Sequence, residues 1–233
     1  MSRVLCVYPE DRSTRFLDRI QNHLKQVLGG DFHCYKVKPN QTSHDRCLTR
    51  LRMVEDEEFV VFLGHGRSDR LYGANTQSDY FISPFFEYQN DSFINTSNVD
   101  VFRGKKVFCL SCNSADGLGA LASEMGAKVF IGFGDIPTDN NIVPELGFEC
   151  PVLLARFKGE INWIIKTSIG YSVRHRLNFF EMFDLVRLLT NVRMDDIILK
   201  HKSLRYRRLL ADHLFEFKQN MRLFGDGNEP ILR

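Results

Sequence analysis

The chain has 233 residues, of which 43% are hydrophobic and 26% are charged, with a formal net charge of +2. This length and composition allow one large domain with a sizeable core, and the small charge gives no reason to expect nucleic acid or a membrane surface as a partner. No segment approaches the roughly 18 apolar residues of a membrane span, and the first residues lack the pattern of a signal peptide. We therefore expect a cytoplasmic protein whose six cysteines are free thiols.

The first part of the chain alternates between apolar runs and amphipathic segments. Residues 3–9 form a short apolar run that predicts a strand, and residues 11–28 carry apolar side chains at helical spacing before two glycines. Residues 31–38 and 43–54 repeat this pattern as a second strand and a second helix. Residues 57–64 predict a third strand, which is apolar on both faces as a central parallel strand should be.

The middle of the chain continues the alternation after an irregular stretch. Residues 67–104 are polar, aromatic and rich in turns, which indicates excursions with short pieces of strand. Residues 105–111 predict a fourth strand, residues 117–125 a short helix, and residues 127–134 a fifth strand. The alternation of strands and helices predicts an α/β fold, a three-layer α/β/α sandwich with a mostly parallel central sheet.

The last third of the chain is helical by its pattern. Apolar residues recur at helical spacing from about 151 to 217, and the tail turns strand-like again before it breaks on glycines. We expect one domain over residues 1–233, with a helical excursion at about 151–217 before a final strand.

Two reactive side chains close predicted strands. His65 follows the third strand between two glycines, and Cys112 follows the fourth. Functional groups collect at the carboxyl ends of parallel strands, so the two side chains face one crevice if these strands are neighbours. A cysteine nucleophile needs a nearby base, and the helix that follows Cys112 is expected to add its positive end. The backbone N–H groups of Gly66 and Cys112 are candidate donors to an oxyanion.

The motifs around these residues resemble a known family. The separation of His65 and Cys112, 112 − 65 = 47 residues, is similar to the spacing of about 50 in caspases. A strand ending in "GHG", a second ending in "LSCNS", and the segment "GLGALASEMGAKVFIGFGD" resemble the caspase-fold (clan CD) cysteine peptidases, and most of all the CHAT-domain subgroup related to caspases and separase. The tail "RLFGDGNEPIL" is similar to the closing strand of that group.

The resemblance implies a function and roles for individual residues. It implies a cysteine endopeptidase in which His65 is the general base, Cys112 the nucleophile, and Gly66 with Cys112 the oxyanion hole. It further implies a protein substrate, which in such peptidases is sometimes a dedicated partner in a cell-death or defence system. No cofactor or metal is expected. The oligomeric state is not predicted.

Asp135 is a candidate for substrate selection. The segment "GFGDIP" stands where the resembling family carries a tryptophan, and a carboxylate at the base of the pocket for the residue on the acyl side would select Arg or Lys. Gly132 and Gly134 would leave room for that side chain. The rival expectation for the substrate is a preference for a small apolar residue. The structural alternatives are that Asp135 caps a turn before Pro137, or that Asp139 and Asn140 form such a cap in a loop.

Several other interpretations compete with the peptidase. The fold could serve as a catalytically silent or latent binding module. Cys109 and Cys112 form a C-x-x-C pattern, which with His65 also suggests a redox dithiol or part of a zinc site, although a clear fourth ligand is missing. Arg208 and His213 resemble, in two residues only, the R-x-x-x-x-H spacing of certain helical ribonucleases. The basic run at residues 200–208 is typical of a solvated helix face.

Overall fold

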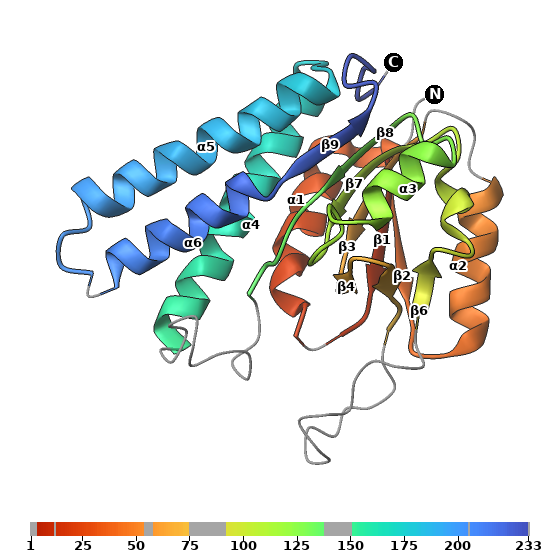
Figure 1. Cartoon of the computed structure of the whole chain (residues 1–233), viewed down its shortest axis with the longest axis horizontal. Helices are drawn as coiled ribbons and strands as arrows, with labels where there is room; N and C mark the ends of the chain where they lie inside the picture. Colours follow the sequence, from red (N-terminus) through yellow and green to blue (C-terminus); the bar gives the residue numbers. More distant parts are fainter. Residues whose placement is uncertain are drawn as a thin grey trace, which may run out of the picture.

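A six-stranded sheet runs through the middle of the molecule, in the order β2-β1-β3-β7-β8-β9 (Figure 1). The computed structural model describes residues 4–11, 13–53, 58–74, 92–137, 151–204 and 206–232. The strands are β1 (Val4–Pro9), β2 (Phe32–Val37), β3 (Phe59–Leu63), β7 (Lys106–Leu110), β8 (Val129–Gly132) and β9 (Arg222–Gly225). All neighbouring pairs are parallel except β8 and β9, which are antiparallel. The predicted α/β fold with a mostly parallel central sheet is confirmed.

The central strands are buried on both faces. Every residue of β1, β3 and β7 is buried, and strands in that position read as continuous apolar runs because helices cover both sides. Lys106 is the charged exception in β7. Its Nζ donates to the carbonyl oxygen of Pro230 at 2.7 Å, which gives the buried ammonium group a partner.

Helices cover the sheet in two layers. One face carries α1 (Asp18–Leu28), α4 (Pro151–Arg174), α5 (Phe179–Leu199) and α6 (Arg207–Gln219), which share one apolar core with β1, β3, β7 and β8. The other face carries α2 (Gln41–Met53), α3 (Leu118–Glu124) and the short helix η3 (Val99–Phe102). Figure 1 shows α5 and α6 side by side at the end of the molecule opposite α2. None of the helices in the described ranges is long and apolar enough to cross a membrane.

Short elements complete the described chain. The single-turn helices η1 (Arg15–Leu17) and η2 (Gly29–Asp31) flank α1. A second sheet is formed by the antiparallel strands β4 (Gly66–Arg67), β5 (Arg70–Tyr72) and β6 (Ser92–Asn95). This small sheet lies within the stretch for which the sequence predicts short pieces of strand.

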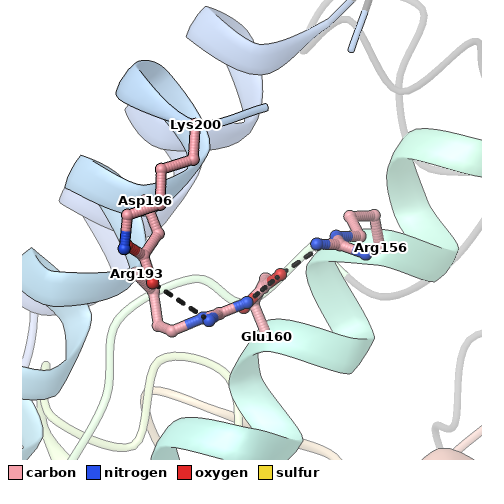
Figure 2. A network of polar contacts seen from close by, with 5 residues as sticks. All are labelled: Arg156, Glu160, Arg193, Asp196 and Lys200. Carbon is pink, nitrogen blue, oxygen red and sulfur yellow. Dashed lines mark hydrogen bonds and ion pairs between the residues drawn. The ribbon is translucent and has the colours of Figure 1, made fainter. Parts of the chain in front are cut away.

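A network of charged side chains around the buried Glu160 joins two helices of the helical excursion. Glu160 on α4 is 4% exposed and accepts two hydrogen bonds from Arg193 on α5, at 2.6 Å and 3.1 Å (Figure 2). Arg156 lies 3.0 Å from the same carboxylate, and Asp196 joins Arg193 to the exposed Lys200. We call these five residues the glutamate network. Because Arg193 bridges two helices, the network fixes the position of α5 against α4.

The order of the strands places a point where the chain reverses direction between β1 and β3. The chain passes from β1 outward to β2, then returns to add β3 on the other side of β1. Loops that leave the carboxyl ends of β1 and β3 therefore diverge, and ligands of open α/β sheets bind at such a point.

Candidate active site

A cavity lies at the carboxyl ends of the strands, where segments that follow β1 and β3 meet. Segments that follow four strands contribute to it, together with one residue of α4. The lining residues are Thr14, Phe16, Leu17, Gly64, His65, Leu110, Ser111, Cys112, Ile136 and Ile161. The condition that the strands before His65 and Cys112 be neighbours is met, since β3 and β7 pair in parallel and Leu63 lies opposite Leu110. The structure thus brings His65 and Cys112 into the wall of one cavity.

His65 is held by two residues from the loop that follows β1. The Nε2 atom of His65 lies 2.5 Å from Ser13 Oγ. Ser13 in turn donates to Asp11 Oδ1 from its hydroxyl at 2.5 Å and from its backbone N–H at 2.7 Å. The Asp11 carboxylate also lies 3.8 Å from His65 Nε2, and both side chains are largely buried, 12% and 19% exposed. We call these three residues the histidine chain.

The direction of donation in the histidine chain follows from the charge of Asp11. Burial acts to raise the pKa of Asp11, but contacts with His65 and hydrogen bonds from Ser13 outweigh it and lower this pKa to about 2. An ionised carboxylate only accepts hydrogen bonds, so the Ser13 hydroxyl proton points to Asp11. Ser13 Oγ then accepts from the Nε2–H of His65. In the neutral imidazole this leaves Nδ1 as the basic nitrogen.

Cys112 sits in a tight turn directly after β7. Asn113 has a φ of 55°, a left-handed conformation, and its N–H donates to the carbonyl of Gly134 at 2.9 Å. The buried Ser114 hydroxyl bonds to the carbonyls of Cys109 and Ser111 and accepts from the N–H of Phe133. These bonds anchor the turn to β7 and to the end of β8, so the cysteine is presented on a rigid support.

The Cys112 thiol is held in its neutral form in this structure. Burial raises the pKa of the thiol to about 11, and the carboxylate of Asp135 acts in the same direction. The Sγ atom donates to the carbonyl oxygen of Ile136 at 3.4 Å. The helix whose positive end was expected to act on the sulfur, α3, begins only at Leu118, six residues after Cys112. The N–H of Leu118 donates to the carbonyl oxygen of Ser68 at 2.7 Å.

The backbone of Gly66 lies so close to neighbouring atoms that no side chain fits there. A Cβ atom at this position would collide with Ser111 Oγ, so the residue is confined to glycine by packing. Tyr72 N–H donates to the His65 carbonyl at 3.0 Å, and Gly66 stands opposite Leu71. Because bonded and non-bonded pairs alternate in an antiparallel ladder, the Gly66 N–H points away from β5. Its role as an oxyanion donor stays a prediction.

Asp135 lies at the rim of this region. Its side chain is exposed, and burial of part of the group, with the nearby Glu216 and Asp116, raises its pKa. Ile136, and not Asp135, is among the described residues that line the cavity. Gly132 packs on the backbone of Ser114 and Ala115, and Gly134 on Asn220, so these glycines serve packing instead of leaving the expected space. Asp139 and Asn140 lie outside the described residues.

Cys109 is separated from Cys112 by the sheet itself. Cys109 is buried in the core beneath α2 and α3, whereas Cys112 packs against the core on the other face. Burial raises the pKa of the Cys109 thiol well above its usual value. Among the described residues, no three His, Cys, Asp or Glu side chains are grouped as metal ligands would be. This placement argues against a working dithiol or a zinc site built from these two cysteines.

The ribonuclease-like pair is also separated. His213 is buried, packs edge-on against the ring of Phe157, and lies 3.5 Å from Glu216. Arg208 is exposed on the same helix. His213 is therefore a core residue of α6.

Asp11 and Ser13 are not among the site residues that the sequence predicts. They follow the first predicted strand directly, in "YPEDRS", so the rule that polar groups gather at the carboxyl ends of parallel strands could have drawn attention to them. Their partner His65 is 52 residues away from Ser13, and no local pattern joins the two. Comparison of the chain with models of known protein families finds no match, and neither does comparison with curated proteins.

Proposed function

We propose that the protein is a cysteine endopeptidase that cleaves a protein substrate through an acyl-enzyme on Cys112. The observation that carries this proposal is the shared cavity of His65 and Cys112 at the ends of adjacent strands, with His65 held by the histidine chain. The resemblance of the "GHG" and "LSCNS" motifs to caspase-fold and CHAT-domain peptidases supports the same assignment.

The proposed chemistry uses the two side chains in sequence. His65 Nδ1 takes the thiol proton as the Cys112 sulfur bonds to the carbonyl carbon of the scissile peptide. The backbone N–H groups of Gly66 and Cys112 stabilise the oxyanion that forms. The C–N bond breaks as the imidazolium gives its proton to the leaving amine, and a water deprotonated by His65 then releases the acyl group from sulfur.

Asp11 and Ser13 support this role of His65. The serine hydroxyl accepts from Nε2–H, and the aspartate keeps that hydroxyl oriented. A hydrogen bond to one ring nitrogen decides which nitrogen carries the proton, so the pair keeps the basic lone pair on Nδ1. When His65 becomes an imidazolium in the reaction, the nearby carboxylate also stabilises its charge.

A latent form of this enzyme is the second candidate, and one observation favours it. The Cys112 thiol donates to the Ile136 carbonyl and has a pKa of about 11, so it is a weak nucleophile in this conformation. Binding of a substrate or partner protein that moves the segment of Ile136 would release the thiol toward His65. A dedicated partner in a cell-death or defence system, and a cytoplasmic location, remain parts of the proposal that rest on the resemblance and on composition.

The experiment is covalent labelling with a peptide chloromethyl ketone, followed by mass spectrometry. We expect labelling at Cys112 in the wild type, and its loss in His65→Ala. Proteolysis should vanish in Cys112→Ala and in His65→Ala, with the double variant scarcely worse because nucleophile and base act as a unit. Cys109→Ala is the matched control and should keep near-normal activity. Full cleavage by Cys112→Ala would refute the peptidase assignment.

The same reagents test substrate selection. Peptides that carry Arg, Lys, Leu or Asp on the acyl side of the cut are compared in the wild type and in Asp135→Ala. A basic preference that disappears in Asp135→Ala would assign the selecting role to Asp135. The apolar side chains of Phe16, Leu17, Ile136 and Ile161 in the cavity wall favour the rival preference for an apolar residue.

A further inference from the structure

Two cysteines stand opposite each other on neighbouring strands at the edge of the sheet. Cys6 of β1 pairs with Cys34 of β2 in parallel register. Both side chains pack against the same core cluster beneath α1, so the two thiols lie on one face of the sheet. Each thiol affects the pKa of the other. Neighbouring strands are about 4.8 Å apart, within the range of about 4.4–6.8 Å between the Cα atoms of a disulfide.

The environments of the two thiols differ. Cys6 is completely buried, whereas Cys34 is partly exposed on the edge strand β2. The hydrogen bond from Cys6 and the charge of Lys36 lower the pKa of Cys34 against the effect of burial. The same hydrogen bond and its burial raise the pKa of Cys6. Cys34 is therefore both the more accessible and the more acidic thiol of the pair.

The position of Cys34 is fixed by the helix above it. Its Sγ atom lies 3.1 Å from Oε1 of Gln21, a buried residue of α1. The amide nitrogen of Gln21 donates to Asp18 at 2.5 Å, and this bond orients the amide oxygen toward the sulfur. Gln21 thus holds the Cys34 sulfur in place, on the strand position opposite Cys6, before any reaction, which reduces the movement needed to join the two sulfurs.

We propose that Cys34 and Cys6 form a peroxide-reactive dithiol, in which Cys34 is oxidised first and Cys6 resolves it to a disulfide. The Cys34 thiolate attacks one oxygen of hydrogen peroxide, the O–O bond breaks, and sulfenic acid and hydroxide form. Cys6, after losing its proton, attacks the Cys34 sulfur and displaces a second hydroxide. With the two thiol protons the hydroxides become water, so two thiols and one peroxide give one disulfide and two waters.

This site is separate from the proposed peptidase dyad. It joins β1 to β2 at one edge of the sheet, whereas Cys112 follows β7, two strands further from β2 than β1 is. Cys47 provides a matched control, since it is a buried thiol of α2 that packs in the core on the opposite face of the sheet.

The test is oxidation of the reduced full-length protein with hydrogen peroxide, alkylation of the remaining thiols, and peptide mapping by mass spectrometry. We expect a cross-linked pair of peptides that carry Cys6 and Cys34. In Cys6→Ser the cross-link is lost, and dimedone traps a sulfenic acid at Cys34. In Cys34→Ser no cross-link forms, and dimedone traps no sulfenic acid at Cys6. Cys47→Ser keeps the wild-type cross-link.

Three results would overturn the proposal. The first is a wild-type protein that keeps both thiols alkylatable after peroxide treatment. The second is a disulfide from Cys34 to Cys47 or to another molecule, and the third is a cross-link that survives in Cys6→Ser. Labelling of Cys112 by the peptide electrophile is measured on the reduced samples, so failure of the peptidase and failure of the dithiol are read separately.

Discussion

Asp11 and Glu160 are two carboxylates with little exposure to solvent, and their partners are of different kinds. Glu160 pairs with the guanidinium of Arg193, which stays charged at every pH that the protein meets. Asp11 reaches His65, the proposed general base, through a serine hydroxyl. Glu160 therefore forms a permanent ion pair, whereas Asp11 orients the proposed general base.

The difference shows how the same buried charge can serve structure or chemistry. The glutamate network joins α4 to α5, and the burial of Glu160, 4% exposed, makes a lost partner costly. The histidine chain joins the loop after β1 to the loop after β3, beside a cavity. The stability of the protein should therefore depend most on Arg193, whereas the orientation and tautomer of His65 should depend most on Asp11 and Ser13.

The largest expected effect is on the glutamate network. Arg193→Met should lower the free energy of unfolding by about 3 kcal/mol, because it leaves the buried Glu160 carboxylate with only the partly exposed Arg156. Urea unfolding monitored by circular dichroism measures this loss. A loss below 1 kcal/mol would show that Arg156 and water compensate fully, and the contrast with Asp11 would then fail.

Asp11→Asn should cost about 2 kcal/mol near pH 6, since the pKa of Asp11 falls from 3.8 to about 2 in the folded protein. A lowered folded-state pKa stabilises the protein above the unfolded pKa, and this stabilisation is lost as the pH falls through about 2. The gap between wild type and variant should thus narrow below pH 4. Unfolding measured from pH 6 to pH 3 tests this.

A gap that stays constant over that range would contradict the assignment of a charged Asp11. Asp69→Asn is the control, because Asp69 is an exposed carboxylate paired with its neighbour Arg70. It should change stability little at any pH in the series.

Ser13→Ala should separate chemistry from folding. Without the hydroxyl acceptor, His65 is no longer held with its proton on Nε2, and we expect kcat to fall by about tenfold, or 1.4 kcal/mol in the barrier. Stability should change by less than in Asp11→Asn. Ser13→Thr, which keeps the hydroxyl, should restore most of the activity. Equal losses in Ser13→Ala and Ser13→Thr would point to packing instead of proton placement.

The smallest effect is expected at the exposed end of the glutamate network. Lys200 is 74% exposed and pairs with Asp196 at 2.6 Å. Exposed ion pairs contribute little to stability because water screens them, so Lys200→Met should lower the free energy of unfolding far less than Arg193→Met. The comparison with Arg193→Met, made in the same unfolding series, isolates burial as the cause of the larger loss.

The order of strands and helices could be predicted from sequence because it depends on local patterns. The run at residues 59–63 is apolar throughout, as a strand covered on both faces requires, and the glycines at 29 and 30 follow the first long helix. The prediction that His65 and Cys112 share one edge of the sheet also follows, since each ends an apolar run and parallel strands end at the same edge.

Contacts between distant side chains were decided only by the tertiary structure. Ser13 meets His65, and Arg193 meets Glu160, because loops and helices far apart in sequence are brought together by the sheet order and by helix packing. The N–H of Leu118, at the start of the short helix that the sequence predicts, donates to the carbonyl oxygen of Ser68, a contact that no local pattern predicts. Apolar spacing and strand ends are properties of short segments, so the sequence by itself determined them. The ionisation and orientation of Asp11 or Cys112 depend on burial and on partners from other segments, and these exist only in the folded chain.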